Sequence, residues 1–188
     1  MTITETDERL DVRPLAGHVG AEINGVDISV PLDAATVDAI RTTWLRWKVV
    51  FFRDQRLDHA SHVRFARQFG DPTPAHPLFD SVGDPEHPAV YPVFKDRFQA
   101  RYDTSGFDHV AWHADVTAAI NPPAASILRG DVIPAYGGDT SFANTVAAYE
   151  GLSPALQRLA DELRAVHRFR LPDSRPRTTA AGTRPAHW

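Results

Sequence analysis

The residues with the clearest capacity for chemistry are a histidine and an aspartate one position apart, in the run Trp112-His113-Ala114-Asp115. In an extended strand, side chains two positions apart point to the same face. His113 and Asp115 are therefore predicted to present an imidazole nitrogen and a carboxylate oxygen to one metal ion. Two histidines and one carboxylate on one face of an iron leave open positions for a co-substrate and oxygen, and these ligands suit Fe(II).

The spacing of these two residues is weak support by itself. The chain has 9 histidines among 188 residues, and with aspartate at about one position in ten, roughly one His-x-Asp pair is expected by chance. The alternative interpretation is a strand-end histidine beside a solvated aspartate. The surrounding sequence has to decide between the two.

Short strands and two helices are predicted for the first part of the chain. Asp33 has the chemistry of a helix cap, and apolar residues recur at helical spacing over 33–47. Asp58 is predicted to cap a second helix that stops at 70–72. Strands are expected at 10–14, 20–24 and 48–52. The second helix is expected to direct Val63, Ala66 and Phe69 toward the core, with His59 and His62 at the surface.

The rest of the chain is predicted to contain a proline-rich loop, short strands and one further helix. A long irregular segment such as 70–110 is usually functional or mobile, so it is interpreted as a loop that covers a site. A helix is predicted to begin at Ser153, because a proline follows this capping residue. Strands are expected at 90–93, 126–129 and 140–142. The apolar stripe of the last helix consists of Leu152, Leu156, Leu159 and Leu163.

Composition and charge exclude several classes of protein. The hydrophobic content of 43% and the length of 188 residues suit one domain, predicted at 1–171. Residues 172–188 contain no Leu, Ile, Val, Met or Phe and are expected to be disordered. The absence of cysteine excludes disulfides and thiolate metal sites. No basic stripe indicates nucleic acid, and no apolar run indicates a membrane span or signal peptide, so a cytoplasmic protein with a small-molecule substrate is expected. A homo-oligomer is left open.

The run from Trp112 to Pro154 resembles the taurine dioxygenase-like (TauD/TfdA) family of Fe(II)/2-oxoglutarate-dependent dioxygenases. The resemblance consists of many motifs in one order and covers about residues 10–170. They are Gly-Ala-Glu-Ile at 20–23, Val-Val-Phe-Phe-Arg-Asp-Gln at 49–55, Phe-Gly at 69–70, Trp-His-x-Asp-Val-Thr at 112–117, Pro-Pro at 122–123, Leu-Arg at 128–129, Gly-Gly-Asp-Thr at 137–140, Phe-Ala-Asn at 142–144 and Ala-Ala-Tyr-Glu-x-Leu-Ser at 147–153.

This resemblance implies an α+β fold with an incomplete double-stranded β-helix (jelly roll) and flanking helices. His113 and Asp115 match the first two iron ligands of the family. Thr140 matches a position whose hydroxyl helps to hold a 2-oxoglutarate carboxylate, and its alternative role is that of a strand threonine after a turn. His76 matches a histidine that points at the acidic group of the substrate in sulfonate-using members, and its alternative role is a structural hydrogen bond in a loop.

The resemblance also implies a function and the loss of two residues of the family's site. The family reaction is the hydroxylation of a small organic acid, a sulfonate among the candidates, with Fe(II) as cofactor and 2-oxoglutarate as co-substrate. The family continues for roughly a hundred residues that supply a second iron histidine and a carboxylate-binding arginine, whereas the sequence departs from the family after Leu171, and His187 lacks a strand context. A truncated or frame-disrupted oxidoreductase with impaired activity is therefore expected. The alternatives are an inactive fragment and a cupin-like module that binds zinc or a small ligand.

Overall fold

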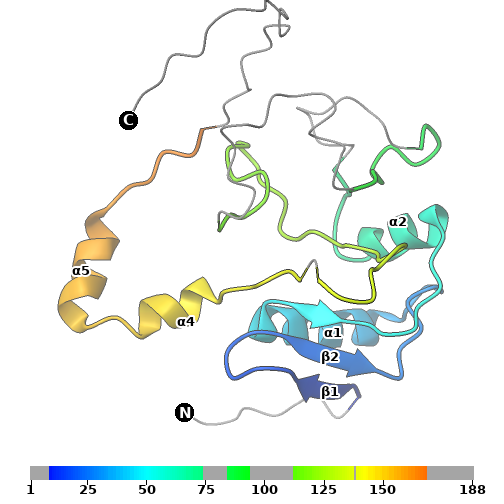
Figure 1. Cartoon of the computed structure of the whole chain (residues 1–188), viewed down its shortest axis with the longest axis horizontal. Coiled ribbons are helices and arrows are strands. Elements are labelled where there is room, and N and C mark those ends of the chain that lie inside the picture. Colours follow the sequence, from blue (N-terminus) through cyan, green and yellow to red (C-terminus); the bar gives the residue numbers. More distant parts are fainter. Residues whose placement is uncertain (1–8, 74–83, 94–111, 138, 169–188) are drawn as a thin grey trace, which may run out of the picture. The chain divides into compact units, whose positions relative to one another are not determined.

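The structure is a computed structural model that describes residues 9–73, 84–93, 112–137 and 139–168 (Figure 1). These residues fall into two compact units, each described here by itself. The first contains the described residues up to Tyr91 together with those from Pro123 to Val166. The second contains the described residues of 92–122 and of 167–188. The prediction of one domain over 1–171 stays a prediction.

A three-stranded sheet opens the first unit. The strands are β1 (Asp11–Pro14), β2 (Ala21–Asn24) and β3 (Val50–Phe51), in the order β1-β2-β3. The strand β1 pairs antiparallel with β2, with Asp11 opposite Asn24, whereas β3 pairs parallel with β2, with Ala21 opposite Val50. Parallel neighbours need a crossover connection, and a helix provides it here. The first two predicted strands are confirmed, and the third is shorter than predicted.

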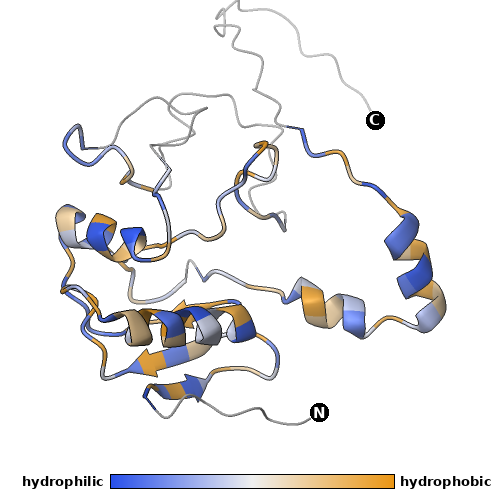
Figure 2. Cartoon of the chain, turned by 180° about the vertical axis from the view of Figure 1, so that it is seen from behind, coloured by the Kyte–Doolittle hydropathy of each residue, from blue (hydrophilic) through white to orange (hydrophobic). Residues whose placement is uncertain are grey.

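The crossover helix is α1 (Ala34–Trp47), and it begins where the sequence predicts. The Asp33 side chain accepts a hydrogen bond of 2.9 Å from the backbone N–H of Thr36, which satisfies one of the free donors of the first turn. At the other end, Lys48 adopts a positive φ of 67°, and its N–H donates to the Trp44 carbonyl at 2.6 Å. This left-handed residue reverses the chain so that it enters β3. In Figure 2 the ribbon of α1 alternates between orange and blue, as an amphipathic helix does.

The second helix, α2 (His59–Arg67), is held by a reciprocal cap. The Asp58 side chain accepts from the Ser61 N–H at 2.7 Å, and the Ser61 hydroxyl accepts from the Asp58 N–H at 2.9 Å. Two donors that the first turn would otherwise leave unpaired are therefore satisfied. The predicted cap at Asp58 is confirmed.

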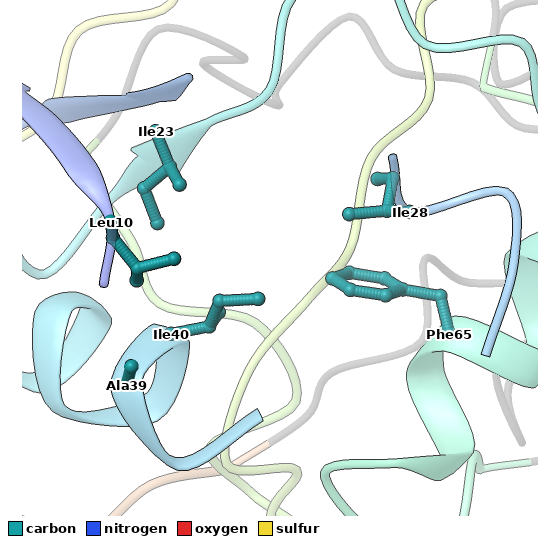
Figure 3. Close-up of a cluster of buried hydrophobic side chains, with 6 residues drawn as sticks. All are labelled: Leu10, Ile23, Ile28, Ala39, Ile40 and Phe65. Atoms are coloured by element: carbon teal, nitrogen blue, oxygen red, sulfur yellow. The ribbon is translucent and has the colours of Figure 1, made fainter. Parts of the chain in front are cut away.

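The sheet and these two helices enclose a small apolar core (Figure 3). Phe65 of α2 is 4% exposed, and its ring lies edge-on to the rings of Phe52 and Phe69, with centroids 5.7 and 5.1 Å away. Phe65 was not among the residues predicted to face the core, whereas Phe69 was. The buried members of the cluster are Leu10, Ile23, Ile28, Ala39, Ile40 and Phe65.

Two short helices follow later in the first unit. In α4 (Thr145–Glu150), the Asn144 side chain caps the first turn by accepting from Val146 and Ala147, and its amide donates to the His18 carbonyl at 2.7 Å. The helix α5 (Pro154–Glu162) begins after Ser153, as predicted. None of the helices in the described parts of the chain is long and apolar enough to span a membrane.

The strands predicted at 90–93, 126–129 and 140–142 are wrong, since none of these residues belongs to a strand. A strand needs a neighbour that takes up its backbone hydrogen bonds. Residues 126–129 instead form hydrogen bonds with helix α2 and with Leu57, the residue before its cap. The Ile127 carbonyl accepts from His62 Nε2 at 3.1 Å, and the Arg129 guanidinium donates to the Leu57 carbonyl at 2.9 Å. A sheet with flanking helices confirms the α+β class, while the double-stranded β-helix stays a prediction.

Candidate functional site

The segment that carries His113 and Asp115 is a turn, contrary to the predicted strand. Residues 112–114 have no regular structure, and a turn runs from Asp115 to Ala118. Val116 adopts a positive φ of 53°, which is rare for a β-branched residue and diverts the chain from an extended path. The Ala119 N–H then closes the turn on the Val116 carbonyl at 3.1 Å. The same-face argument for a strand therefore does not apply to this pair.

The turn nevertheless brings the two side chains together. His113 Nε2 lies 3.4 Å from Asp115 Oδ1, and the side chains are 71% and 56% exposed. Two ligands bound about 2.1 Å from one ion at a right angle would lie about 3 Å apart. The observed separation is close to that value, so the two atoms can share an ion after a small adjustment. One nitrogen and one oxygen donor at this spacing fit Fe(II).

The other two predicted site residues are Thr140 and His76. Thr140 is exposed in the irregular segment before α4 and belongs to the first unit, whereas His113 and Asp115 belong to the second. His76 lies outside the described residues, so its proposed role stays a prediction. Within the described ranges, no three histidine or carboxylate side chains form a group that could hold a metal ion.

A second cluster of histidines, which sequence reasoning missed, lies at the start of α2. His59 Nδ1 is 3.1 Å from Asp84 Oδ2, and the His59 and His87 rings meet edge-on with centroids 6.0 Å apart. The hydrogen bond from His59 holds the pKa of Asp84 below its usual value. These three residues line an open cavity of about 420 Å³ together with Asp58 and Arg129.

His62 is partly buried, contrary to the prediction that it lies at the surface. Its Nε2 must donate to the Ile127 carbonyl, because that oxygen only accepts, and its Nδ1 is buried without a hydrogen-bond partner. Protonation would place a charged N–H at this buried position, so burial lowers the pKa of His62, with Arg129 acting in the same direction. The spacing of His59 and His62 on one helical face was the available signal for a cluster.

His167 makes a further histidine contact in the second unit. His167 Nδ1 lies 2.9 Å from the Thr117 hydroxyl, two positions after Asp115. This contact joins the end of the described chain to the turn that carries the candidate metal ligands. His167 is therefore a structural residue of that turn and not an additional ligand in this arrangement.

Comparison with known proteins identifies the class to which this turn and fold belong. The family model described as taurine catabolism dioxygenase TauD, TfdA family matches residues 11–187, so the chain belongs to the TauD/TfdA family of dioxygenases. This confirms the family resemblance found in the sequence.

Several relatives are similar over most of the chain. An alpha-ketoglutarate-dependent sulfate ester dioxygenase from Pseudomonas putida is 47% identical over 160 residues, which are 84% of this chain and 49% of the relative. An alkylsulfatase from Acinetobacter baylyi is 39% identical over 167 residues, covering 88% of this chain and 49% of the relative. The crystal structure of a taurine dioxygenase from Burkholderia xenovorans matches with a TM-score of 0.72 and 47% identity, covering 86% of this chain and 54% of that one. The chain thus spans about half the length of these relatives.

Proposed function

We propose that the chain provides two protein ligands of an Fe(II)- and 2-oxoglutarate-dependent dioxygenase site, His113 and Asp115. The observation that supports this most directly is the distance of 3.4 Å between His113 Nε2 and Asp115 Oδ1 in a chain of this family. Thr140 is proposed to donate its hydroxyl to a 2-oxoglutarate carboxylate, and His76 to face the acidic group of the substrate.

Each ligand has a defined protonation state in this proposal. A metal ion binds the neutral imidazole through an unprotonated nitrogen and the carboxylate in its ionised form. His113 must therefore present Nε2 without a proton, and Asp115 must be charged. When bound, the iron supplies the oxidative chemistry in which 2-oxoglutarate is decarboxylated and the substrate is hydroxylated. The protein contributes binding and orientation of the reacting groups.

The substrate is proposed to be a small organic acid that carries a sulfur oxyanion. Two relatives are named for sulfate esters, the Pseudomonas sulfate ester dioxygenase and the Acinetobacter alkylsulfatase. A sulfonate dioxygenase from Saccharomyces cerevisiae is 29% identical over 168 residues. The higher identity of the first two relatives supports proposing a sulfate ester ahead of a sulfonate.

Metal binding tests the ligand assignment. Anaerobic titration of Fe(II), with and without 2-oxoglutarate, should give a weaker dissociation constant for His113→Ala than for the unchanged chain, by at least about tenfold. Loss of residues that only support metal ligands already costs 10- to 100-fold, and a ligand itself should cost no less. His18→Ala is the matched control, because this exposed histidine lies in the loop between β1 and β2. Equal affinities of the unchanged chain and His113→Ala would refute the proposal.

Turnover by the 188-residue polypeptide alone is expected to be very low. Catalytic metal sites normally have at least three protein ligands, and the described residues provide two near one another. Both side chains are more than half exposed, so water weakens the polar contacts that would hold the co-substrate. The assay is succinate formation from 2-oxoglutarate with Fe(II), ascorbate and an alkyl sulfate. Succinate well above the level of His113→Ala would show that a third ligand is available to this polypeptide.

A further inference from the structure

Two histidines that the proposed iron site does not use lie together at the start of α2. His59, in the first turn of that helix, meets the His87 ring edge-on, with ring centroids 6.0 Å apart. Both residues are half-buried and line one open cavity. Imidazole nitrogens are the commonest metal ligands in proteins, so this pair is a candidate binding site for a metal ion.

Asp84 fixes which nitrogen of His59 carries a proton. The Asp84 carboxylate, whose pKa is lowered, only accepts hydrogen bonds, and its Oδ2 lies 3.1 Å from His59 Nδ1, so this nitrogen is the donor. The neutral ring then has an unprotonated Nε2, which is the state that binds a metal ion. A carboxylate that accepts from the second nitrogen of the ring is the usual support of a histidine metal ligand.

The same aspartate also places His87. Asp84 Oδ1 accepts from the Glu86 N–H at 3.0 Å, and the Asp84 carbonyl accepts from the His87 N–H at 2.9 Å. The His87 carbonyl in turn accepts from the Val90 N–H at 2.8 Å. These hydrogen bonds organise residues 84–90 into consecutive turns. One residue therefore holds the ring of His59 through its side chain and the backbone of His87 through its carbonyl.

The charge around the pair favours a cation. The cavity is lined by two carboxylates, Asp58 and Asp84, and by one guanidinium, Arg129. The guanidinium is already engaged, because it donates to the Leu57 carbonyl at 2.9 Å and to the Asp131 carboxylate at 2.8 Å. An anion would therefore meet two carboxylates and a cation that is already paired, whereas a divalent cation would be attracted by both carboxylates.

We propose that His59 and His87 together bind Zn(II) or a divalent ion of similar ligand preference, with Asp84 orienting both rings. Imidazole suits Zn(II), Cu(II) and Ni(II). Two nitrogens each about 2.1 Å from one ion lie at most about 4.2 Å apart, and edge-on rings with centroids 6.0 Å apart reach that separation by a small rotation. In the described part of the chain no group of three histidine or carboxylate side chains could hold an ion, so water completes the coordination.

An ion at this position links two segments that are distant in the sequence. His59 belongs to α2, whereas His87 lies in the turns that follow Asp84. The folded chain holds both rings together and the unfolded chain does not, so the ion binds the folded state preferentially and stabilises it. The site shares no residue with the proposed iron site, so its failure and the failure of the proposed function are distinguishable.

Zinc titration tests the assignment. Zn(II) is titrated against a chromophoric chelator into the 188-residue chain carrying His113→Ala, which removes the proposed iron ligand. His59→Ala and His87→Ala, each added to this background, should weaken zinc binding at least about tenfold. Asp84→Asn should weaken it by about 10- to 100-fold, because the amide keeps an acceptor for the Glu86 N–H but turns a donor toward His59, which moves the ring proton to Nε2.

Asp131→Asn is the matched control. It removes an equal charge that also acts on His59, and this carboxylate pairs with Arg129 and not with either ring of the proposed site. Because Asp131 is exposed, salt screens its charge, and zinc affinity should change by less than about threefold. Urea unfolding without metal verifies that each variant folds, as expected for side chains that are not fully buried.

Two further measurements locate the ion. The ring NMR signals of His59 and His87 should be the first histidine signals to shift at substoichiometric zinc. Saturating zinc should raise the urea midpoint of the His113→Ala chain but not that of the chain that also carries His87→Ala. The proposal is overturned if zinc affinity survives both histidine substitutions, or if other histidine rings shift first. An equal loss for Asp131→Asn and Asp84→Asn would also overturn it, since charge alone would then explain the binding.

Discussion

Residues 9–73 and residues 112–166 use the same local signals but reach different degrees of burial. Each region has helices that begin at capping side chains, Asp58 in the first and Ser153 in the second. Yet within the described residues every buried hydrophobic side chain lies between Leu10 and Phe65. Helix capping is a local property, whereas most helix stability comes from packing of an apolar face. The second region therefore has helix caps and apolar helix positions like those of the first, but its described hydrophobic side chains are not buried.

This difference also bears on function, because the candidate metal ligands lie in the poorly buried region. His113 and Asp115 are close enough to share an ion, yet both side chains are more than half exposed. Charges and hydrogen bonds are weaker in water than in a dry cavity. A covered site would therefore hold metal and co-substrate more tightly than the exposed pair can. The first region contains the buried core, and the second contains the proposed metal ligands together with most of the exposed apolar residues.

The largest expected effect comes from the core of the first region. Phe65→Ala should lower the free energy of unfolding by about 3–5 kcal/mol, because it leaves a cavity beside Phe52 and Phe69. Phe65→Leu is the milder variant and should cost less than about 1.5 kcal/mol. Urea denaturation of the 188-residue chain measures both. Leu159→Ala, at a residue 55% exposed, should change stability by less than about 0.5 kcal/mol. Equal losses at Phe65 and Leu159 would break the comparison between the two regions.

A smaller effect should distinguish two serine caps of similar chemistry. Ser61 is buried and completes the cap of α2, so Ser61→Ala should lower the global free energy of unfolding by about 1 kcal/mol. Ser153 accepts from the Leu156 N–H at 3.4 Å at the start of the exposed helix α5. Because α5 is not packed into the core, Ser153→Ala should affect local opening of α5 far more than global unfolding. Hydrogen exchange of α5 and urea unfolding, measured on both variants, separate the two effects. A global loss for Ser153→Ala as large as that for Ser61→Ala would show that α5 belongs to the cooperative core.

Local features of this fold were predictable from the sequence. The caps at Asp33, Asp58 and Ser153 depend on the residue itself and the next three positions, so the pattern predicted where their helices begin. The first two strands were predicted as well, and they pair with each other across a short loop, from Pro14 opposite Ala21 to Asp11 opposite Asn24. The pairing of His113 with Asp115 was predicted for the wrong backbone reason, since a turn at Val116 and not a strand brings them together.

Features that depend on distant contacts could not be predicted. The stretch 126–129 has the composition of a strand, but its hydrogen bonds are not made to another strand. The Ile127 carbonyl accepts from the His62 ring, and the Arg129 guanidinium donates to the Leu57 carbonyl. His62 looked like a surface residue because helical spacing alone does not reveal what packs over α2. The contact of His59 with Asp84 spans 25 positions, and no local pattern signals it.

The smallest effect concerns pH and links the two regions through His62. Burial lowers the pKa of His62 in the folded chain below its ordinary value near 6.5. The unfolded chain therefore takes up a proton at higher pH than the folded chain does, so stability falls as the pH drops through 6.5 toward the folded pKa. Asp84 also has a lowered pKa, but its contribution is present above the ordinary aspartate value near 3.8 and is lost only below it. The window between pH 7.5 and 5 thus reports on His62 and not on Asp84.

His62→Gln keeps a donor for the Ile127 carbonyl without a titrating ring, and it should flatten the dependence of the urea midpoint on pH in that window. His18→Gln is the control, because it makes the same substitution at an exposed histidine. If His62→Gln retains the full slope, then the contact between α2 and Ile127 does not bury this ring in solution, and residues 126–129 are even less attached to the first region than the structure indicates.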